Sequence, residues 1–199
     1  MDSAIQRLQR DEAGLIGKII AEGFSDDPVN NWAFNGTSAM QPVFTTMAEH
    51  LYLPNGFGHK TPDGKAGTMW LPPLAAKEYG PAATLKMALS IAWHGGPKAI
   101  ANTLRLDGFL KQKRPAEPHY YLFAISVHPN LQGTGVGGRL MRAALEDVDQ
   151  AHMPAYLESS KDTNIGFYQS HGFTVIDKVK PTPDCPPLWL MWRDAQQQN

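Results

Sequence analysis

The sequence predicts an α/β domain built on a mixed, strongly twisted sheet of about six to seven strands with helices on both faces. Three observations lead to this prediction. An aromatic and β-branched run at residues 120–127 indicates a buried strand. Apolar residues spaced three and four apart between Leu140 and Val148 describe one face of a helix that ends before Pro154. A second short strand is expected at 155–159, so strands and helices alternate here.

The other elements follow from local periodicity and turn chemistry. A first helix is expected with Asp11 as its N-cap and Gly23 near its end, and Asp26-Asp27-Pro28 is expected to form a turn. Thr61-Pro62-Asp63-Gly64 suits a hairpin, and Gly95-Gly96-Pro97 interrupts a helical region. The further expected helices are 38–51, 83–94, 97–110 and 163–170, and the further expected strands are 57–59, 66–71, 173–178 and 188–192.

Composition limits the classes of function. The 199 residues are 42% hydrophobic, which is enough to bury a core without disulfides. With 18 basic and 19 acidic residues the net charge is -1, so no global field attracts nucleic acid or an anionic membrane. The single cysteine, Cys185, excludes an internal disulfide and a cysteine-based zinc site, and the histidines form no metal-binding pair. We expect a cytoplasmic protein, a monomer or homodimer, without a metal ion, a membrane span or a nucleic-acid partner.

The most informative feature is the glycine cluster Gln132-Gly133-Thr134-Gly135-Val136-Gly137-Gly138 at the start of the helix after the buried strand. Glycine costs about 1 kcal/mol relative to alanine inside a helix, so the cluster does not serve helix propensity. It suits a backbone that must curl and let a ligand approach closely. Because unpaired N–H groups at a helix N-terminus favour anions, a phosphate cradle is the leading interpretation, and a tight loop that binds nothing is the alternative.

Spacing distinguishes between the known phosphate-binding turns. A Walker A loop is excluded, because no Gly-Lys-Ser/Thr ending is present. The dinucleotide pattern G-x-G-x-x-G matches Gly133, Gly135 and Gly138, with Glu158 as the acidic residue about 20 positions on. However, the glycines of that pattern follow their strand directly and open a large domain. Here five residues separate Val127 from the first glycine, and the remaining chain is short.

The turn also fits the pattern Q/R-x-x-G-x-G/A at Gln132, Gly135 and Gly137, which resembles the GNAT N-acetyltransferase superfamily. The segment from Asn164 through Tyr168 to Gly172-Phe173 is similar to the N-x-x-x-Y-x-x-x-G-F ending of that family. The resemblance covers residues 120–176. Two further stretches resemble the small-molecule branch that includes puromycin N-acetyltransferase: Leu157-Glu158-Ser159-Ser160 and Pro186-Pro187-Leu188-Trp189.

The resemblance implies a single GNAT domain over residues 1–199, with a cofactor-binding core at 119–178 and acetyl-CoA as cosubstrate. It implies a sheet split in the middle, where free backbone groups at Ile125 to Val127, in the strand before the turn, pair with the pantetheine arm and one N–H polarises the thioester carbonyl. The pyrophosphate is expected on the amides of the turn. The expected cofactor-binding residues are Ile125, Ser126, Val127, Gln132, Gly133, Thr134, Gly135, Val136, Gly137, Gly138 and Asn164.

The resemblance also implies a reaction: direct acetyl transfer to a primary amine of a small molecule. Tyr168 matches the family tyrosine and is the candidate acid that protonates the leaving thiolate. His119, at the start of the strand, and Glu158, at the end of the next, are the two candidate bases, with water as a third possibility. By analogy, the acceptor pocket would be walled by Asp26, Asp27, Trp32 and the helices of 83–110.

Two other functions stay open from the sequence: an NAD-dependent oxidoreductase and a non-catalytic CoA-binding module. A covalent acetyl-cysteine route is not expected, because Cys185 lies in a proline-rich loop without an evident base beside it.

Overall fold

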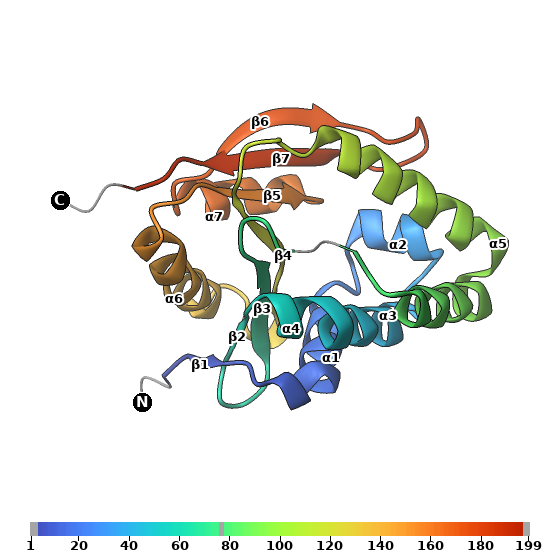
Figure 1. Cartoon of the computed structure of the whole chain (residues 1–199), viewed down its shortest axis with the longest axis horizontal. Coiled ribbons are helices and arrows are strands. Elements are labelled where there is room, and N and C mark those ends of the chain that lie inside the picture. Colours follow the sequence, from blue (N-terminus) through green and yellow to red (C-terminus); the bar gives the residue numbers. More distant parts are fainter. Residues whose placement is uncertain (1–3, 76–77, 197–199) are drawn as a thin grey trace.

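The computed structural model describes residues 4–75 and 78–196, and its central feature is one seven-stranded sheet in the order β1-β2-β3-β4-β5-β7-β6 (Figure 1). The strands are β1 Gln6–Arg7, β2 His59–Lys60, β3 Ala66–Leu71, β4 Tyr120–Val127, β5 Ala155–Ser159, β6 Thr174–Val179 and β7 Leu188–Arg193. Only β4 and β5 pair in parallel among these strands, and the other neighbours are antiparallel. The predicted mixed sheet is confirmed, and it is not the parallel sheet of a dinucleotide-binding domain.

Helices cover both faces of this sheet, as predicted (Figure 1). They are α1 Ala13–Gly23, α2 Pro28–Phe34, α3 Met40–Met47, α4 Leu53–Asn55, α5 Pro81–Lys113, α6 Val136–Gln150 and α7 Ile165–Gln169. A π-helical turn at Ala48–Tyr52 joins α3 to α4, and single 3-10 turns occupy Arg10–Glu12, Pro129–Leu131 and Asp162–Asn164.

The sheet separates two hydrophobic cores because successive side chains of a strand point to opposite faces. Along β3, Met69 and Leu71 belong to the core under α1 and α3, which we call the first core, whereas Trp70 belongs to the core under α6 and α7, the second core. Along β4, Tyr121 lies in the first core and Leu122 in the second. The middle of the sheet therefore carries the first core on one face and the second core on the other.

Several local details differ from the sequence predictions: the expected strand at 57–59 is β2, and the expected helix at 38–51 is α3 followed by a π-helical turn. Asp11 does not cap α1, because a 3-10 turn precedes it in which the Gln9 N–H donates to Glu12 Oε2 at 2.9 Å. Asp26-Asp27-Pro28 does not only turn the chain: Asp27 is the N-cap of α2 and accepts from the Asn30 N–H at 2.8 Å. Strand β1 was not predicted, since two exposed residues carry no hydrophobic pattern.

Helix α5 is bent where the sequence places its interruption. Gly96 adopts φ 71° and ψ -171°, which glycine tolerates, and Pro97 starts the second half. The buried Asn102 then donates to the Trp32 carbonyl at 2.9 Å and fixes residues 97–113 beside α2. The bend returns the chain to the start of β4 and lays this half against the first core (Figure 1).

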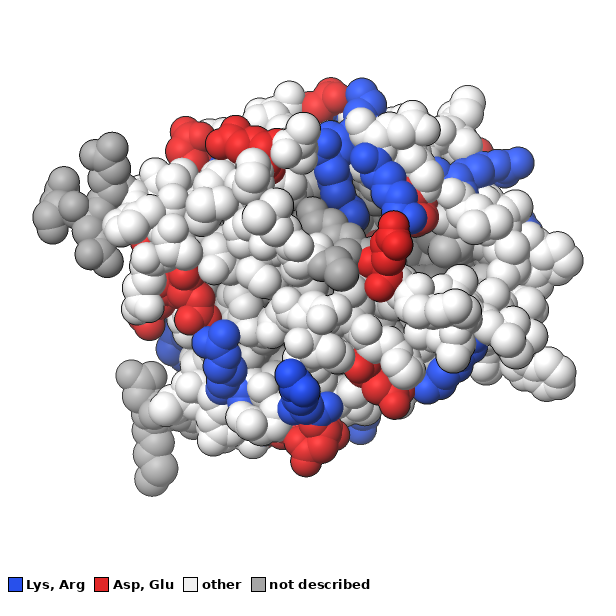
Figure 2. Space-filling view, in the orientation of Figure 1, with Lys and Arg blue, Asp and Glu red and all other residues white. Residues whose placement is uncertain are grey.

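Acidic and basic residues are nearly equal in number. Figure 2 shows acidic and basic side chains interspersed across one face. Within residues 4–75 and 78–196, no helix is long and apolar enough to cross a membrane.

Candidate active site

Strands β4 and β5 part in the middle of the sheet. Their parallel pairing extends from Tyr120–Ala155 to Leu122–Leu157 and goes no further. Beyond that point β4 continues to pair with β3 and β5 with β7. The register of β4 against β3 skips Phe123, so a β-bulge lies at the point of divergence. Because a bulge bends its strand, it accounts for the separation of β4 from β5.

The divergence opens a cleft of about 670 Å³ that passes between the two cores. Its lining includes most of the residues predicted from the sequence: Ile125, Ser126, Val127, Gln132, Gly133, Gly135, Gly137, Gly138, Glu158, Asn164 and Tyr168. Thr134 and Val136 belong to the same turn but do not line the cleft; Val136 is buried in a small cluster with Ala66 and Leu140. The size is typical of a ligand site.

The glycine turn presents unpaired amides at the mouth of the cleft. Gly133 and Gly135 have φ of +76° and +82°, and a Cβ at either would project into open space rather than into a protein atom closer than 3.9 Å. Helix α6 begins directly after Gly135, and no described side chain caps it. The first amides of a helix lack internal partners, so those of Val136, Gly137 and Gly138 remain for a ligand. This arrangement fits the diphosphate of a CoA thioester.

Basic side chains flank the turn, which the sequence analysis missed. A Cβ at Gly138 would meet Arg142 Nη1 at 3.3 Å and His171 Nε2 at 3.8 Å. Arg142 lies on α6 and His171 follows α7, so no local sequence pattern connects the two. The Arg142 guanidinium would add positive charge beside a bound phosphate.

The end of β4 supplies a free N–H to the cleft. The His128 N–H donates to the Lys65 carbonyl, on the β3 side, at 2.8 Å. Because successive peptide groups of a strand point to opposite sides, the Val127 N–H points to the side from which β5 has parted. The carbonyl of Val127 accepts from Gln132 Nε2 at 3.2 Å, which ties the glycine turn to the strand. The Ser126 hydroxyl instead donates to the Ile19 carbonyl at 2.8 Å.

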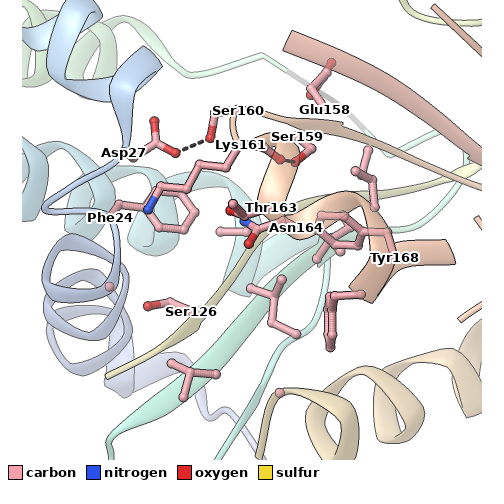
Figure 3. Close-up of a pocket in the computed structure, with 18 of the residues that line it drawn as sticks. Phe24, Asp27, Ser126, Glu158, Ser159, Ser160, Lys161, Thr163, Asn164 and Tyr168 are labelled. Carbon is pink, nitrogen blue, oxygen red and sulfur yellow. Dashed lines mark hydrogen bonds between the residues drawn. The ribbon is translucent and has the colours of Figure 1, made fainter. Parts of the chain in front are cut away.

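Tyr168 and Asn164 come from the segment that closes the cleft on the side of the second core (Figure 3). Burial, and secondarily the charge of Asp27, raise the pKa of the Tyr168 phenol above its ordinary value. The hydroxyl therefore keeps its proton at neutral pH and can donate a hydrogen bond to a group in the cleft. Asn164, four residues earlier, precedes α7 and lines the same cleft.

Glu158 lies on the other side of the cleft and is held by two donors. Arg114 Nε donates to Oε1 at 3.1 Å and the Tyr121 hydroxyl donates to Oε2 at 2.6 Å. The guanidinium also lies over the Tyr121 ring, 4.3 Å from its centroid. Strand alternation puts Glu158 on the face of Tyr156, toward the first core. Arg114 was not predicted, because it joins this network only through the bend of α5.

His119 is not brought to the cleft. It is 3% exposed, its Nδ1 lies 2.6 Å from the Glu117 carbonyl oxygen, and its ring contacts Tyr156 and Trp192. It lines a separate small cavity with residues 115–118 instead. The structure therefore corrects its placement: it sits before the first pair of β4, whereas the cleft opens beyond the last pair with β5. This position does not suit a base that acts beside Tyr168.

Two contacts join the loops on either side of the cleft. The buried Asp27 accepts a hydrogen bond from the Ser160 hydroxyl, and Lys161 Nζ donates to Asp26 Oδ1 at 2.5 Å (Figure 3). Both aspartates line the cleft. Trp32 does not: its indole N–H donates to Asp184 Oδ2 at 2.9 Å.

A metal ion has no evident site in the part of the chain that the structure describes, because no three His, Cys, Asp or Glu side chains gather there. The cleft instead combines free amides, a protonated phenol and a carboxylate. These groups suit acyl transfer better than redox chemistry.

Comparison with known proteins agrees with this geometry. Residues 92–175 match the family model described as acetyltransferase (GNAT) domain. A structure of a histone acetyltransferase HPA2 and related acetyltransferase from Corynebacterium glutamicum is 19% identical, with a TM-score of 0.71 over 100% of this chain and 99% of that one. Arylalkylamine N-acetyltransferase 2 from Aedes aegypti is 13% identical, with a TM-score of 0.60 over 96% and 98%.

The fold is thus the GNAT fold, and residues 92–175 carry the acetyltransferase domain match. This match contains β4, the glycine turn, α6, β5 and Tyr168, the elements that build the cleft.

Proposed function

We propose that the protein transfers the acetyl group of acetyl-CoA directly to a primary amine of a small molecule. One observation carries the proposal: the gap between β4 and β5 leads from the uncapped amides of α6 to Tyr168 and Glu158 within one cleft. A cosubstrate with a diphosphate at one end and a thioester at the other matches that sequence of groups.

Residues on both sides of the cleft take part in the reaction. The amine nitrogen forms a bond to the thioester carbonyl carbon while the carbon–sulfur bond breaks. The Val127 N–H stabilises the negative charge on the carbonyl oxygen, and Tyr168 gives its proton to the departing thiolate. The nitrogen loses its own proton to water or to Glu158, which lies across the cleft from Tyr168. Fixing these groups around the thioester lowers the entropic part of the barrier.

Titration calorimetry and thiol detection test the proposal on the full chain. We expect micromolar binding of acetyl-CoA, no binding of NADH, and thiol release that requires an amine. Binding of NADH alone would favour the oxidoreductase. Binding of acetyl-CoA without thiol release over a broad amine panel would favour a CoA-binding module.

A further inference from the structure

One end of the cleft has an apolar wall. It consists of Phe24, Leu106, Leu110, Phe123 and Leu188. Leu188 is part of the first core, and the other four side chains pack against that core while remaining half-buried. The wall therefore presents apolar surface to the cleft that the protein itself does not cover. Uncovered apolar surface in a concave site favours ligand binding, because the free energy falls when a ligand removes that surface from water.

The bend of α5 creates this wall. Leu106 and Leu110 stand one helical turn apart in the half of α5 that follows Gly96. Leu104 lies on the same half but is 68% exposed and does not line the cleft. The apolar lining is thus a property of one helix face and not of the whole helix.

The polar groups at this end can bind an amine. Glu158 lies on the first-core face of the sheet, as the wall does; its charge is paired with Arg114, and each of its oxygens accepts one hydrogen bond. A carboxylate oxygen can accept a second. Among the described residues of the lining, Lys161 is the single lysine or arginine, and it is paired with Asp26. Acceptors with carboxylate or phosphate groups would find no free cation there.

We propose that this end of the cleft is the acceptor subsite for a primary amine carried on a bulky apolar group, an arylalkyl or branched alkyl amine. The inference rests on the proposed acetyl transfer. Glu158 binds the amine group, and the apolar wall covers the hydrocarbon. Polyamines and amino sugars fit poorly, because their further polar groups would be buried against Phe24, Leu106 and Leu110 without partners.

Amine specificity of the full-length protein tests the subsite. With saturating acetyl-CoA, we compare kcat/KM for 2-phenylethylamine with that for ethanolamine and putrescine by thiol detection. Burial of one aromatic group predicts a preference of about 10- to 150-fold for 2-phenylethylamine. Equal or better turnover of the two polar amines would refute the subsite and leave the acetyltransferase function intact.

Matched variants of α5 locate the preference. We expect Leu110→Gln and Leu106→Gln each to lower kcat/KM for 2-phenylethylamine about tenfold, mainly through KM. Leu104→Gln, on the exposed face of the same helix, should leave it unchanged. Thermal unfolding shows whether each variant is folded. If Leu104→Gln lowers the value as much as Leu110→Gln does, the wall has no role.

A binding measurement separates this inference from the transferase function. Calorimetric titration of the CoA-loaded protein with 2-phenylethylamine should show binding, and ethanolamine should show none. Absence of 2-phenylethylamine binding refutes the subsite whether or not any amine is acetylated. A protein that binds 2-phenylethylamine but neither acetyl-CoA nor CoA refutes the transferase proposal instead.

Discussion

Gly135→Ala tests the phosphate cradle most directly. Gly135 has φ +82°, where an alanine costs about 1–2 kcal/mol. For a chain of 199 residues this lowers Tm by about 2–8 °C. The added methyl group would meet no protein atom closer than Arg139 Nη1 at 3.9 Å, so it projects into the space expected for the diphosphate.

The effect on binding follows from the amides that the methyl group obstructs. Loss of one hydrogen bond to a charged phosphate costs about 1.5–3 kcal/mol, which weakens acetyl-CoA binding about 10- to 150-fold. Gly137→Ala should weaken binding less, because its Cβ would make ordinary contacts with Val127 at 3.5 Å and Phe167 at 3.6 Å. Titration calorimetry gives the Kd, and calorimetric unfolding gives Tm.

Gly64→Ala is the matched control. Gly64 has φ +64° in the hairpin turn before β3, outside the cleft, so alanine carries a similar backbone cost there. A Cβ at Gly64 would also lie 3.2 Å from Leu15 Cδ1, so we expect a loss in Tm at least as large and no change in Kd for acetyl-CoA. Should Gly135→Ala bind acetyl-CoA as tightly as Gly64→Ala, the diphosphate does not lie on this turn.

Three further predictions concern single titratable groups. Tyr168→Phe should reduce kcat about 10²- to 10⁴-fold with Kd for acetyl-CoA unchanged, and full activity of the variant would remove the role of Tyr168. Because burial raises the pKa of Tyr168, its ionisation should cause no alkaline fall in kcat below about pH 10. Burial lowers the pKa of His59, so the unfolded chain binds the proton first and the free energy of unfolding should fall as pH drops below about 6.5. Urea unfolding at two pH values should show a smaller fall for His59→Gln than for the unchanged protein. An equal fall would contradict this linkage. Burial raises the pKa of Cys185 to about 11, so the native thiol should resist alkylation. Cys185→Ala should still transfer acetyl groups. Detection of acetylated Cys185 would overturn direct transfer.

Local sequence was sufficient for most elements of the cofactor half. The strand at 120–127 and the helix ending before Pro154 appear as predicted, because a β-branched run and a helical apolar stripe each specify one local structure. The glycine spacing likewise indicated a turn that needs left-handed residues, and Gly133 and Gly135 adopt that conformation. These features depend on neighbours within a few positions.

The tertiary structure alone decided which side chains share the cleft. His119 and Glu158 were equal candidates from the sequence, yet the parting of β4 from β5 brings Glu158 to the cleft and leaves His119 before the first paired residue, at the closed end of the two strands. Leu110 reaches the cleft, and Arg114 reaches Glu158 without lining the cleft itself, only because α5 bends at Gly96. Local periodicity determines the elements, but contacts between residues tens of positions apart depend on how those elements pack, and no short window of sequence contains that information.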